Sequence, residues 1–379
     1  MAKKKNKKFS SFLDNPIDYT LLITVLLLLT LGLIMVLSAS SPTSLSESGK
    51  SYKYFLKQAV FAVLGLMAMG VISKIDYRFY KKFYKWAYII AFVLLALVLV
   101  IGKKINGARR WIYFTETLSF QPSELVKFCM IIFFAGILTR DREELKYFFK
   151  GWIKHLLYLV PIIGLLIVEP HLSASIVIIG ICAIMMLLAG CKLWQIIVPG
   201  IGGGIPLLGI AIWKIPKFSH AIKRVTTFMD PWKDQLGDGW QVIQSLYAIG
   251  SGGLFGAGLG QSKQKYLYLP EPQNDFIFSV LAEELGFVGC AFVIVLFAIF
   301  IWRGILIAMK APDMFGSLVA SGITALVGIQ VIINIAVVTS SMPATGMPLP
   351  FFSYGGTALF IMLCQIGVLL NISRAGRKT

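Results

Sequence analysis

The chain has 379 residues, of which 57% are hydrophobic and only 14% charged, with a mean hydropathy of +0.78 and a formal net charge of +18. This composition is far too apolar for a soluble globular protein. The basic surplus follows the loops between apolar segments and forms no separate basic face, so nucleic acid is not an expected partner. An integral membrane protein is the class that remains.

Ten stretches are apolar enough and long enough to cross the hydrocarbon core, which takes about 20 residues of helix. The sequence therefore predicts an all-α polytopic membrane protein with about ten transmembrane helices. A basic tail, 1–17, precedes the single membrane domain, 18–373, and a second basic tail, 374–379, follows it. The predicted spans are 18–40, 55–73, 84–102, 122–139, 153–168, 172–190, 193–213, 276–302, 314–339 and 354–373.

The positions of Lys and Arg predict the orientation of these spans. The two tails, the loops 74–85 and 140–154, and the single residues Lys192, Arg303 and Lys310 together hold 21 of the 36 basic residues. Basic residues favour the cytoplasmic side, so both termini are expected in the cytoplasm. The one long loop, 214–275, is then extracellular.

Two segments on the predicted outer face are basic nevertheless. They are 103–111, which contains Arg110, and 214–224, which ends in Arg224. Positive charge on this side opposes the insertion preference, and binding of a phosphate or diphosphate would explain it. The alternative is a chance departure from a statistical rule.

A paired acid and base stand at the start of the fourth predicted span, in the segment 121–127. Pro122 and Ser123 suit the first positions of a helix, and Glu124 and Lys127, three residues apart, share one face. The pair is either a structural clamp between helices or a functional group. In the functional interpretation Lys127 supplies a cation, and Glu124 holds it or binds a divalent metal.

The outer loop contains a predicted surface helix and a glycine-rich segment. Residues 238–249 have helical apolar spacing, which predicts a helix lying flat on the membrane and forming a floor beside Asp275. The segment 250–260 lacks the Gly-Lys-Ser/Thr ending of a phosphate-binding loop. A re-entrant or closely packed backbone is expected there, not a nucleotide site.

Asp275 is the most informative residue of the chain, because it stands where this polar loop meets a predicted membrane helix. An acid kept at such a boundary is a candidate functional group. The alternative is that Asp275 only caps the helix beginning at Phe276. A carboxylate near a helix N-terminus is expected to stay ionised, and thus to be available as a weak base.

The segment 342–357 contains three prolines and three glycines and cannot form a regular span. Irregular backbone at membrane depth is tolerated where protein or a water-filled cavity surrounds it. A re-entrant outer loop is expected, with Ser353, Tyr354 and Thr357 facing the same cavity as Asp275. Packing alone is the alternative.

Taken together, the motifs resemble the SEDS family of membrane proteins, the FtsW/RodA/SpoVE group, along nearly the whole chain. The amino-acid sequences of the segments 229–232 and 256–262 resemble FtsW or SpoVE more than RodA. The motifs that carry the resemblance are Asn106–Trp111, Gln121–Lys127, Leu269–Glu271, Asp275–Phe278, Glu283–Gly286, Pro343–Gly346 and Ser353–Thr357.

The resemblance implies a peptidoglycan glycosyltransferase that polymerises lipid II, an undecaprenyl-diphosphate-linked disaccharide pentapeptide. Polymerisation would take place at the outer face of the bacterial plasma membrane, during cell division, elongation or sporulation. The implied partners are lipid II, a class B penicillin-binding protein and membrane lipids.

The resemblance also implies roles for single residues. Asp275 corresponds to the family's catalytic aspartate, and Glu124 to its paired acid. The substrate-binding candidates are Arg110, Lys127, Arg224, Glu124 and Ser353. His171 stands where many relatives have aspartate, which puts in doubt a role for this position as metal ligand or second acid.

The expected chemistry is an inverting transfer of a disaccharide from a diphosphate to a sugar hydroxyl. Asp275 would act as general base, and the basic residues would stabilise the departing diphosphate. A divalent cation, Mg²⁺ or Mn²⁺, could assist, and the sequence leaves its ligands open. The alternatives are a lipid II flippase without glycosyl-transfer chemistry and a scaffold that only recruits other proteins.

Overall fold

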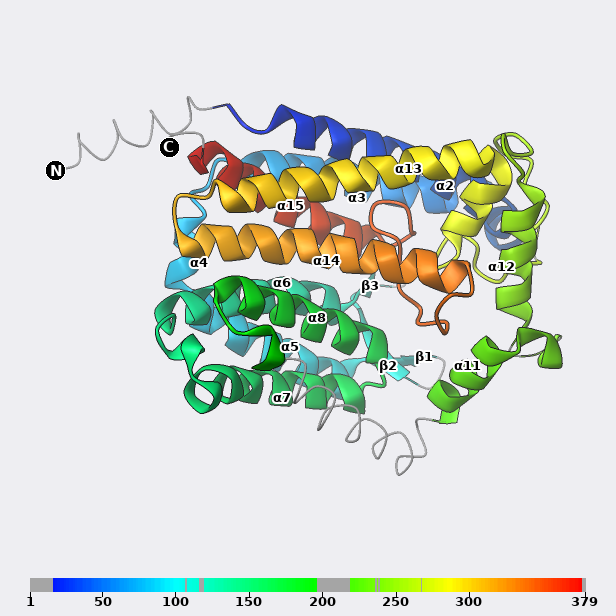
Figure 1. Ribbon diagram of the computed structural model, residues 1–379. Helices are drawn as coiled ribbons and strands as arrows, with labels where there is room; N and C mark the ends of the chain where they lie inside the picture. Colours follow the sequence, from blue (N-terminus) through cyan, green and yellow to red (C-terminus); the bar gives the residue numbers. More distant parts are fainter. Residues whose placement is uncertain are drawn as a thin grey trace.

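A computed structural model describes residues 16–105, 108–115, 119–195, 219–235, 237, 239–266 and 268–376. Within these residues, nine helices are long and apolar enough to cross a membrane, and they run side by side in one bundle (Figure 1). They are α2 (Tyr19–Ser48), α3 (Lys53–Ile72), α5 (Tyr84–Ile101), α6 (Pro122–Arg140), α7 (Lys154–Val168), α8 (Leu172–Ala189), α13 (Ile277–Met309), α14 (Met314–Val338) and α15 (Gly356–Gly376).

Nine of the ten predicted spans are therefore confirmed as helices. The tenth, 193–213, falls almost entirely outside the described residues. Successive helices alternate in direction, so α8 ends where α2 begins, and α13 begins at the opposite end. The chain therefore passes from one end of the bundle to the other between Ala189 and Ile277, which is consistent with a tenth crossing in that interval. A hydrogen bond of 3.1 Å from the Asp18 N–H to the Ser373 hydroxyl joins the start of α2 to the end of α15.

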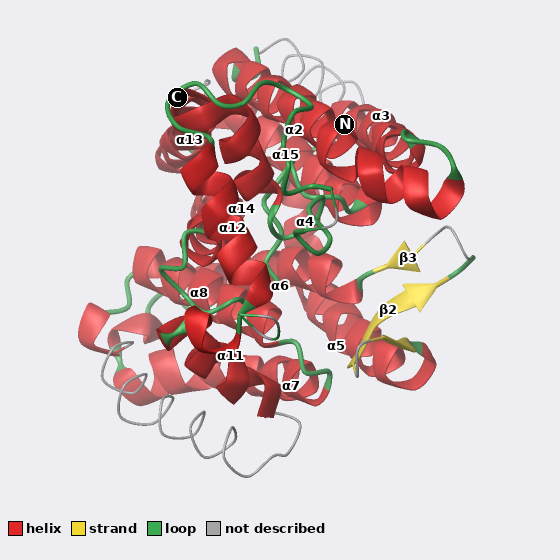
Figure 2. Ribbon diagram, turned by 90° about the vertical axis from the view of Figure 1, so that its right-hand side faces the viewer, coloured by secondary structure: helices red, strands yellow, loops and turns green. Residues whose placement is uncertain are grey.

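The membrane bundle is all-helical, as predicted, and one small sheet that was not predicted accompanies it. Three short antiparallel strands form a small sheet at the end of the bundle that carries Asp275, called here the Asp275 end. They are β1 (Lys103–Ile105), β2 (Ala108–Tyr113) and β3 (Ser119–Phe120), visible at the right of Figure 2. Within the basic segment 103–111, which was predicted to lie outside, the described residues thus form the paired strands β1 and β2 between α5 and α6.

The centre of the bundle is formed by α6 and α14. Both are apolar around most of their circumference, and α14 packs against α6, α8, α13 and α15. Since lipid tails are as apolar as these side chains, close packing, and not the removal of apolar surface from water, decides which helix faces are buried. α2 and α3 pack on α13 and α15 respectively.

The helix α13 is broken near its start, because Gly286 has a φ of 64°. The glycine-rich segment 250–260 fills the break. Ala257 N–H donates to the Glu283 carbonyl at 2.9 Å, and Phe287 N–H donates to the Gly253 carbonyl at 2.9 Å. A Cβ on Gly286 would lie 2.3 Å from the nitrogen of Gly256. The prediction of a closely packed glycine backbone is confirmed, and hydrogen bonds lost at the break are replaced.

Two buried acids lie just before this break and hold the following loop. Glu284, which is fully buried, forms an ion pair of 2.8 Å with buried Lys265 and accepts a hydrogen bond of 2.7 Å from Ser38 on α2. Glu283 accepts hydrogen bonds from the Lys263 N–H at 2.8 Å and the Gln264 N–H at 3.3 Å. The chain that leads to Asp275 is therefore fixed to α2 and α13 by buried, paired charges.

Two helices cross the Asp275 end of the bundle, α11 (Ser219–Met229) and α12 (Trp240–Ser251) (Figures 1 and 2). The amphipathic helix predicted over 238–249 is confirmed as α12. Its buried residues Val242, Ile243 and Ala248 face the protein, and Ser245 bonds at 2.7 Å to both Ser279 on α13 and the Val338 carbonyl on α14. The helix forms the predicted floor beside Asp275.

Between α14 and α15 the chain has no helix from Thr339 to Gly355, which confirms the irregular loop expected there. Met347, Leu349 and Phe352 of this loop are all at most 3% exposed, so it re-enters the bundle. A Cβ on Gly32 of α2 would lie 2.2 Å from the Phe351 carbonyl oxygen, and this close approach explains the glycine. The loop reaches the level of Asp275 because α2 leaves room for it.

Candidate functional site

Asp275 is held in place through its backbone by the re-entrant loop. The Asn334 amide on α14 donates to the carbonyl of Asp275 and to that of Met347, both at 2.7 Å. The Ser353 hydroxyl donates to the Asn274 carbonyl at 2.8 Å, and the Tyr354 N–H donates to the Gln273 carbonyl at 2.8 Å. The segment before α13 and the loop before α15 are thus joined into one rigid frame.

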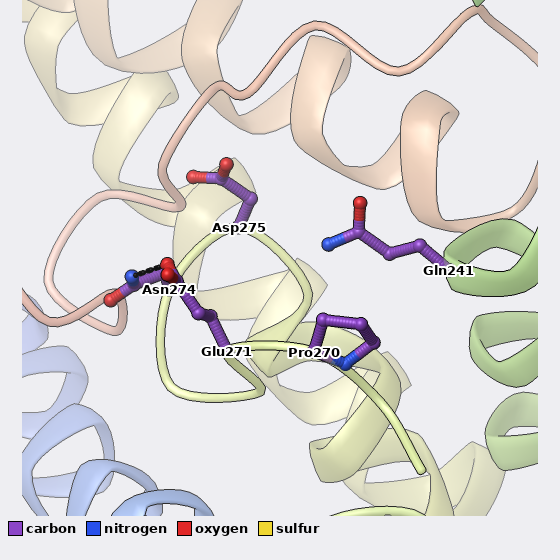
Figure 3. A pocket seen from close by; sticks show the side chains of 5 residues that line it. All are labelled: Gln241, Pro270, Glu271, Asn274 and Asp275. Carbon is purple, nitrogen blue, oxygen red and sulfur yellow. Dashed lines mark hydrogen bonds between the residues drawn. The ribbon is translucent and has the colours of Figure 1, made fainter. Parts of the chain in front are cut away.

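The Asp275 carboxylate is not used as a helix cap. Phe276, not Asp275, is the N-cap of α13, and within the described residues no group donates a hydrogen bond to the Asp275 carboxylate. The interpretation of Asp275 as a helix cap is wrong. The carboxylate points toward the re-entrant loop (Figure 3), where a Cβ on Gly346 would lie 3.4 Å from its Oδ2. Gly346 has a φ of 70°, so a side chain there would be strained as well.

Burial and, after it, the charge of Glu271 raise the pKa of Asp275 from its ordinary value to about 6, while the charges of Arg224 and Arg110 act in the opposite direction. Desolvation disfavours the charged form of a carboxylate, and here it outweighs the stabilisation expected from the helix N-terminus. Asp275 is therefore a stronger base than the sequence predicted, and it is still mostly ionised at pH 7.

Arg110 projects from β2 toward the chain between α7 and α8, where it donates a hydrogen bond to the Pro170 carbonyl. Burial lowers the pKa of Arg110, and the neighbouring charge of Arg224 lowers it too, while Glu169 and Asp275 raise it. Arg224 on α11 donates to the Ala344 carbonyl at 3.2 Å, two residues from Gly346. Both predicted guanidinium groups therefore act on Asp275.

Lys127 and Glu124 form the pair that their spacing predicts, at 2.8 Å, with side chains 3% and 13% exposed. Lys127 is thus held in the protein by its neighbour on the previous turn of α6. Its charge also reaches His171, whose pKa burial lowers to about 3, with Arg110 and Lys127 contributing in that order. The charges of Lys127 and Arg110 therefore both act on one buried imidazole.

His171 has a structural place in this arrangement. Its Nδ1 accepts a hydrogen bond of 3.3 Å from the Ala174 N–H at the start of α8. Nε2 faces the Gln121 amide at 2.8 Å and the Ser123 hydroxyl at 3.4 Å. The His171 ring therefore joins the start of α8 to the start of α6. Because its pKa is lowered, the ring is uncharged at neutral pH.

The structure does not place Ser353 as a substrate ligand. The residue is only 9% exposed, and its hydroxyl accepts a hydrogen bond of 2.7 Å from the Leu349 N–H and donates to the Asn274 carbonyl. Tyr354 packs edge-on against Tyr54 of α3, with ring centroids 4.9 Å apart, and Thr357 donates to the Ser119 carbonyl at 3.2 Å. Ser353 and Thr357 thus hold the loop by side-chain hydrogen bonds to residues distant in sequence, and Tyr354 holds it by ring packing.

Glu169 is an acid whose place in the site the sequence did not reveal. It is 1% exposed, and neither of its carboxylate oxygens has a hydrogen-bond partner within the described residues. Burial raises its pKa to about 8, against the charge of Arg110. Glu169 is therefore mainly uncharged at pH 7 and leaves the positive charge of Arg110 available to an anion.

A pocket of about 240 Å³ opens beside Asp275 and is lined by Gln241, Pro270, Glu271, Asn274 and Asp275 (Figure 3). Gln241 comes from α12, and the other four come from the segment that ends at Asp275. Only Asp275 among them was predicted from the sequence to be a site residue. The pocket forms because α12 folds back over this segment, with the Trp240 indole N–H donating to the Tyr268 carbonyl at 2.7 Å.

The described residues contain no group of three or more His, Cys, Asp or Glu side chains that could hold a metal ion. Two carboxylates, Glu271 and Asp275, line the pocket, but a third ligand is not contributed by the described chain. Divalent cations bound in proteins take most of their ligands from oxygen atoms of several groups. The residues here do not form such a set, and no step of the chemistry is assigned to a metal.

Comparison with known proteins places these features in a family. The chain is 44% identical to stage V sporulation protein E of Bacillus subtilis (strain 168), over 95% of this chain and 98% of that protein. It is 38% identical to a probable peptidoglycan glycosyltransferase FtsW of Geobacter sp. (strain M18), over 94% and 96% of the two chains.

Two solved structures share the fold. One, described as showing structural coordination of polymerization and crosslinking by a peptidoglycan synthase complex, matches with a TM-score of 0.79 and 29% identity, over 96% of this chain and 99% of that one. The other is the rod shape determining protein RodA of Thermus thermophilus, with a TM-score of 0.70 and 27% identity, over 95% and 97%. A model of the FtsW/RodA/SpoVE family, described as cell cycle protein, matches residues 19–378. The chain belongs to the FtsW/RodA/SpoVE family.

Proposed function

We propose that this protein is a peptidoglycan glycosyltransferase that polymerises lipid II, with Asp275 as its general base. The observation that carries the proposal is the state of Asp275: a carboxylate with no hydrogen-bond partner among the described residues, a pKa raised to about 6, and a pocket beside it. The relatives named FtsW, matched over nearly their full length, support the same activity.

In the proposed reaction, the acceptor sugar hydroxyl loses its proton to Asp275 as its oxygen attacks the anomeric carbon of the donor sugar. The bond from that carbon to the diphosphate breaks, and the anomeric configuration inverts. A base whose pKa lies near the working pH suits this step, because it is ionised and still accepts a proton well.

The leaving diphosphate needs positive charge, which Arg110, Arg224 and Lys127 supply. A guanidinium group matches two phosphate oxygens at once, and such charge-assisted hydrogen bonds are strong in a site shielded from water. Arg110 and Arg224 act on Asp275 electrostatically, so the diphosphate would lie next to the base. Lys127, held by Glu124, extends the positive region toward α6.

We place the Asp275 end of the bundle at the outer face of the bacterial plasma membrane, with both termini in the cytoplasm. The distribution of Lys and Arg supports this orientation. A class B penicillin-binding protein is the proposed partner, supported by the match to a synthase complex that combines polymerization with crosslinking.

A flippase is the rival function, and one assay separates the two. The purified protein with its transpeptidase partner is mixed in detergent with labelled lipid II, and glycan length is followed on gels. Detergent removes the two faces between which a flippase would move lipid. The proposal expects glycan strands longer than the starting disaccharide, and their absence with folded protein and partner present would contradict it.

A further inference from the structure

Glu169 is a buried acid that the proposed reaction does not use. It is the C-cap of α7, it is 1% exposed, and neither of its carboxylate oxygens has a hydrogen-bond partner among the described residues. A carboxylate enclosed without donors is unstable as an anion, so it either holds a proton or takes a cation as its partner. A cation within reach of Glu169 therefore competes with that proton.

Arg110 is that cation. Its guanidinium donates to the carbonyl of Pro170, the residue next to Glu169, and its buried Nε has no partner within the part of the chain that the structure describes. The charges of Arg110 and Glu169 also act on each other. Arg110 thus has two competing acceptors on successive residues. One is the carbonyl that it holds in this structure, and the other is the carboxylate of Glu169 once that group is ionised.

The other charges near this place do not compete for Glu169. Among the described residues, Arg110 on β2 is the one charged group that shifts the pKa of Glu169. His171, two residues further on, is uncharged at neutral pH, and Lys127 on α6 is paired with Glu124. The helices α5 and α8 pack against α7, but α8 contains no charged residue and the charged residue of α5 lies at its other end. The state of Glu169 therefore depends on what Arg110 binds.

An anion on Arg110 decides between the two acceptors. A diphosphate bound to the guanidinium offsets the positive charge that favours ionised Glu169, so Glu169 keeps its proton. Ionised Glu169, in contrast, repels the diphosphate and attracts Arg110, and both effects are strong in a site shielded from water. Binding of the diphosphate and protonation of Glu169 therefore favour each other, as two linked equilibria must.

Resting on the proposed function, we propose that Glu169 is a proton-linked counter-ion of Arg110 that controls how long the diphosphate stays bound. Glu169 holds a proton while the diphosphate of lipid II lies on Arg110. After the transfer it gives that proton to water, pairs with Arg110 and so helps the undecaprenyl diphosphate product to leave. Glu169 makes and breaks no bond of the substrates, so it is a positioning residue that acts through Arg110.

This linkage makes the affinity for lipid II depend on pH. The pKa of Glu169 is raised from 4.5 to about 8 in the substrate-free protein, and a bound diphosphate raises it further. The affinity is therefore complete below pH 8 and falls as the pH rises through that value. The dissociation constant should increase roughly tenfold from pH 7 to pH 9, and binding at pH 8 should take up about half a proton.

The test measures binding in the Asp275→Asn protein with its transpeptidase partner, in detergent. Without its base this protein should bind lipid II and not consume it, and the substitution also removes the carboxylate that titrates near pH 6. Calorimetric titrations with lipid II at pH 8, in two buffers of different ionisation enthalpy, count the protons taken up. The dissociation constant is measured at pH 7 and pH 9. Infrared difference spectra with and without lipid II record the carbonyl band of a protonated carboxylic acid.

Adding Glu169→Gln, which imitates the protonated acid, identifies the group. This variant should bind lipid II at pH 7 within about twofold of its parent, keep that affinity at pH 9, take up no proton and lose the infrared band. Glu47→Gln, which neutralises an exposed acid of the same end of the bundle, is the matched control and should keep every response of the parent. Thermal unfolding shows that each variant is folded.

The outcomes separate this inference from the proposed function. Binding of lipid II without proton uptake, or the same uptake in folded Glu169→Gln, would overturn the counter-ion role and leave the polymerase intact. Should Glu169→Gln fail to fold, the proton count and the infrared band of the parent decide alone, because a permanently protonated Glu169 changes neither. Polymerisation by the Asp275→Asn protein would overturn the proposed function instead, and no binding of lipid II at any pH would overturn both.

Discussion

The titration of Asp275 gives a sharp test of how the site works, because burial and the charge of Glu271 raise its pKa to about 6 from an ordinary 3.8. The ionised form is the base, so activity should fall as pH falls through 6. With this pKa, about nine tenths of Asp275 is ionised at pH 7 and about one tenth at pH 5. The value of kcat/KM for lipid II should therefore drop roughly tenfold between these two pH values.

The perturbation that identifies the group is Glu271→Gln, which removes a negative charge beside Asp275. A neighbouring negative charge disfavours ionisation of a carboxylate, so its removal should lower the pKa of Asp275. The acid limb of the pH profile should then move to lower pH. Burial, the larger cause, is unchanged, so the limb should stay above the ordinary range for aspartate.

The assay follows initial rates of lipid II polymerisation from pH 4.5 to pH 8 at low substrate concentration, which reports the free enzyme. The variant Glu47→Gln, which neutralises another acid of the Asp275 end, serves as the control and should keep the wild-type limb. A wild-type limb near pH 4, or a limb that does not move in Glu271→Gln, would show that the base titrates in another environment or is another residue.

Three further predictions concern the buried charges. Lys127→Ala should lower the free energy of unfolding by about 3 kcal/mol because it leaves Glu124 unpaired, whereas exchanging the two charges should restore thermal stability without polymerisation; normal synthesis by the exchanged protein would make the pair only structural. Arg110→Lys should weaken the use of lipid II by about 1–3 kcal/mol, measured by titration of lipid II, and unchanged titration curves would remove the diphosphate role. Lys265→Met should cost about 3–5 kcal/mol of stability, and adding Glu284→Leu should recover most of it in thermal unfolding; no recovery would mean that the charges themselves hold the loop.

Much of the architecture could be predicted from local sequence features. The apolar segments predicted nine helices that the structure confirms, since length and hydropathy alone decide whether a segment can cross a membrane. The contact between Glu124 and Lys127 was also predictable, because residues three apart on a helix are neighbours. The closely packed glycine segment followed from its composition.

Features that depend on residues far apart in the chain could not be predicted. Ser353 looked like a substrate ligand because it belongs to a polar motif, but its hydroxyl bonds to Asn274, 79 residues away. The pocket joins Gln241 to the segment 270–275, which only the fold brings together. The pKa of Asp275 was expected to stay low beside a helix N-terminus, and burial, which a sequence does not display, reversed that expectation.

The central claim is that the Asp275 carboxylate is the base, and Asp275→Asn tests it most directly. Asparagine has nearly the same shape and cannot accept a proton at pH 7. Purified wild-type and variant proteins, each with the transpeptidase partner, are given labelled lipid II in detergent, and their thermal unfolding is compared. The account predicts equal folding, long glycan strands from the wild type and none from the variant. Robust glycan synthesis by the folded Asp275→Asn protein would contradict it.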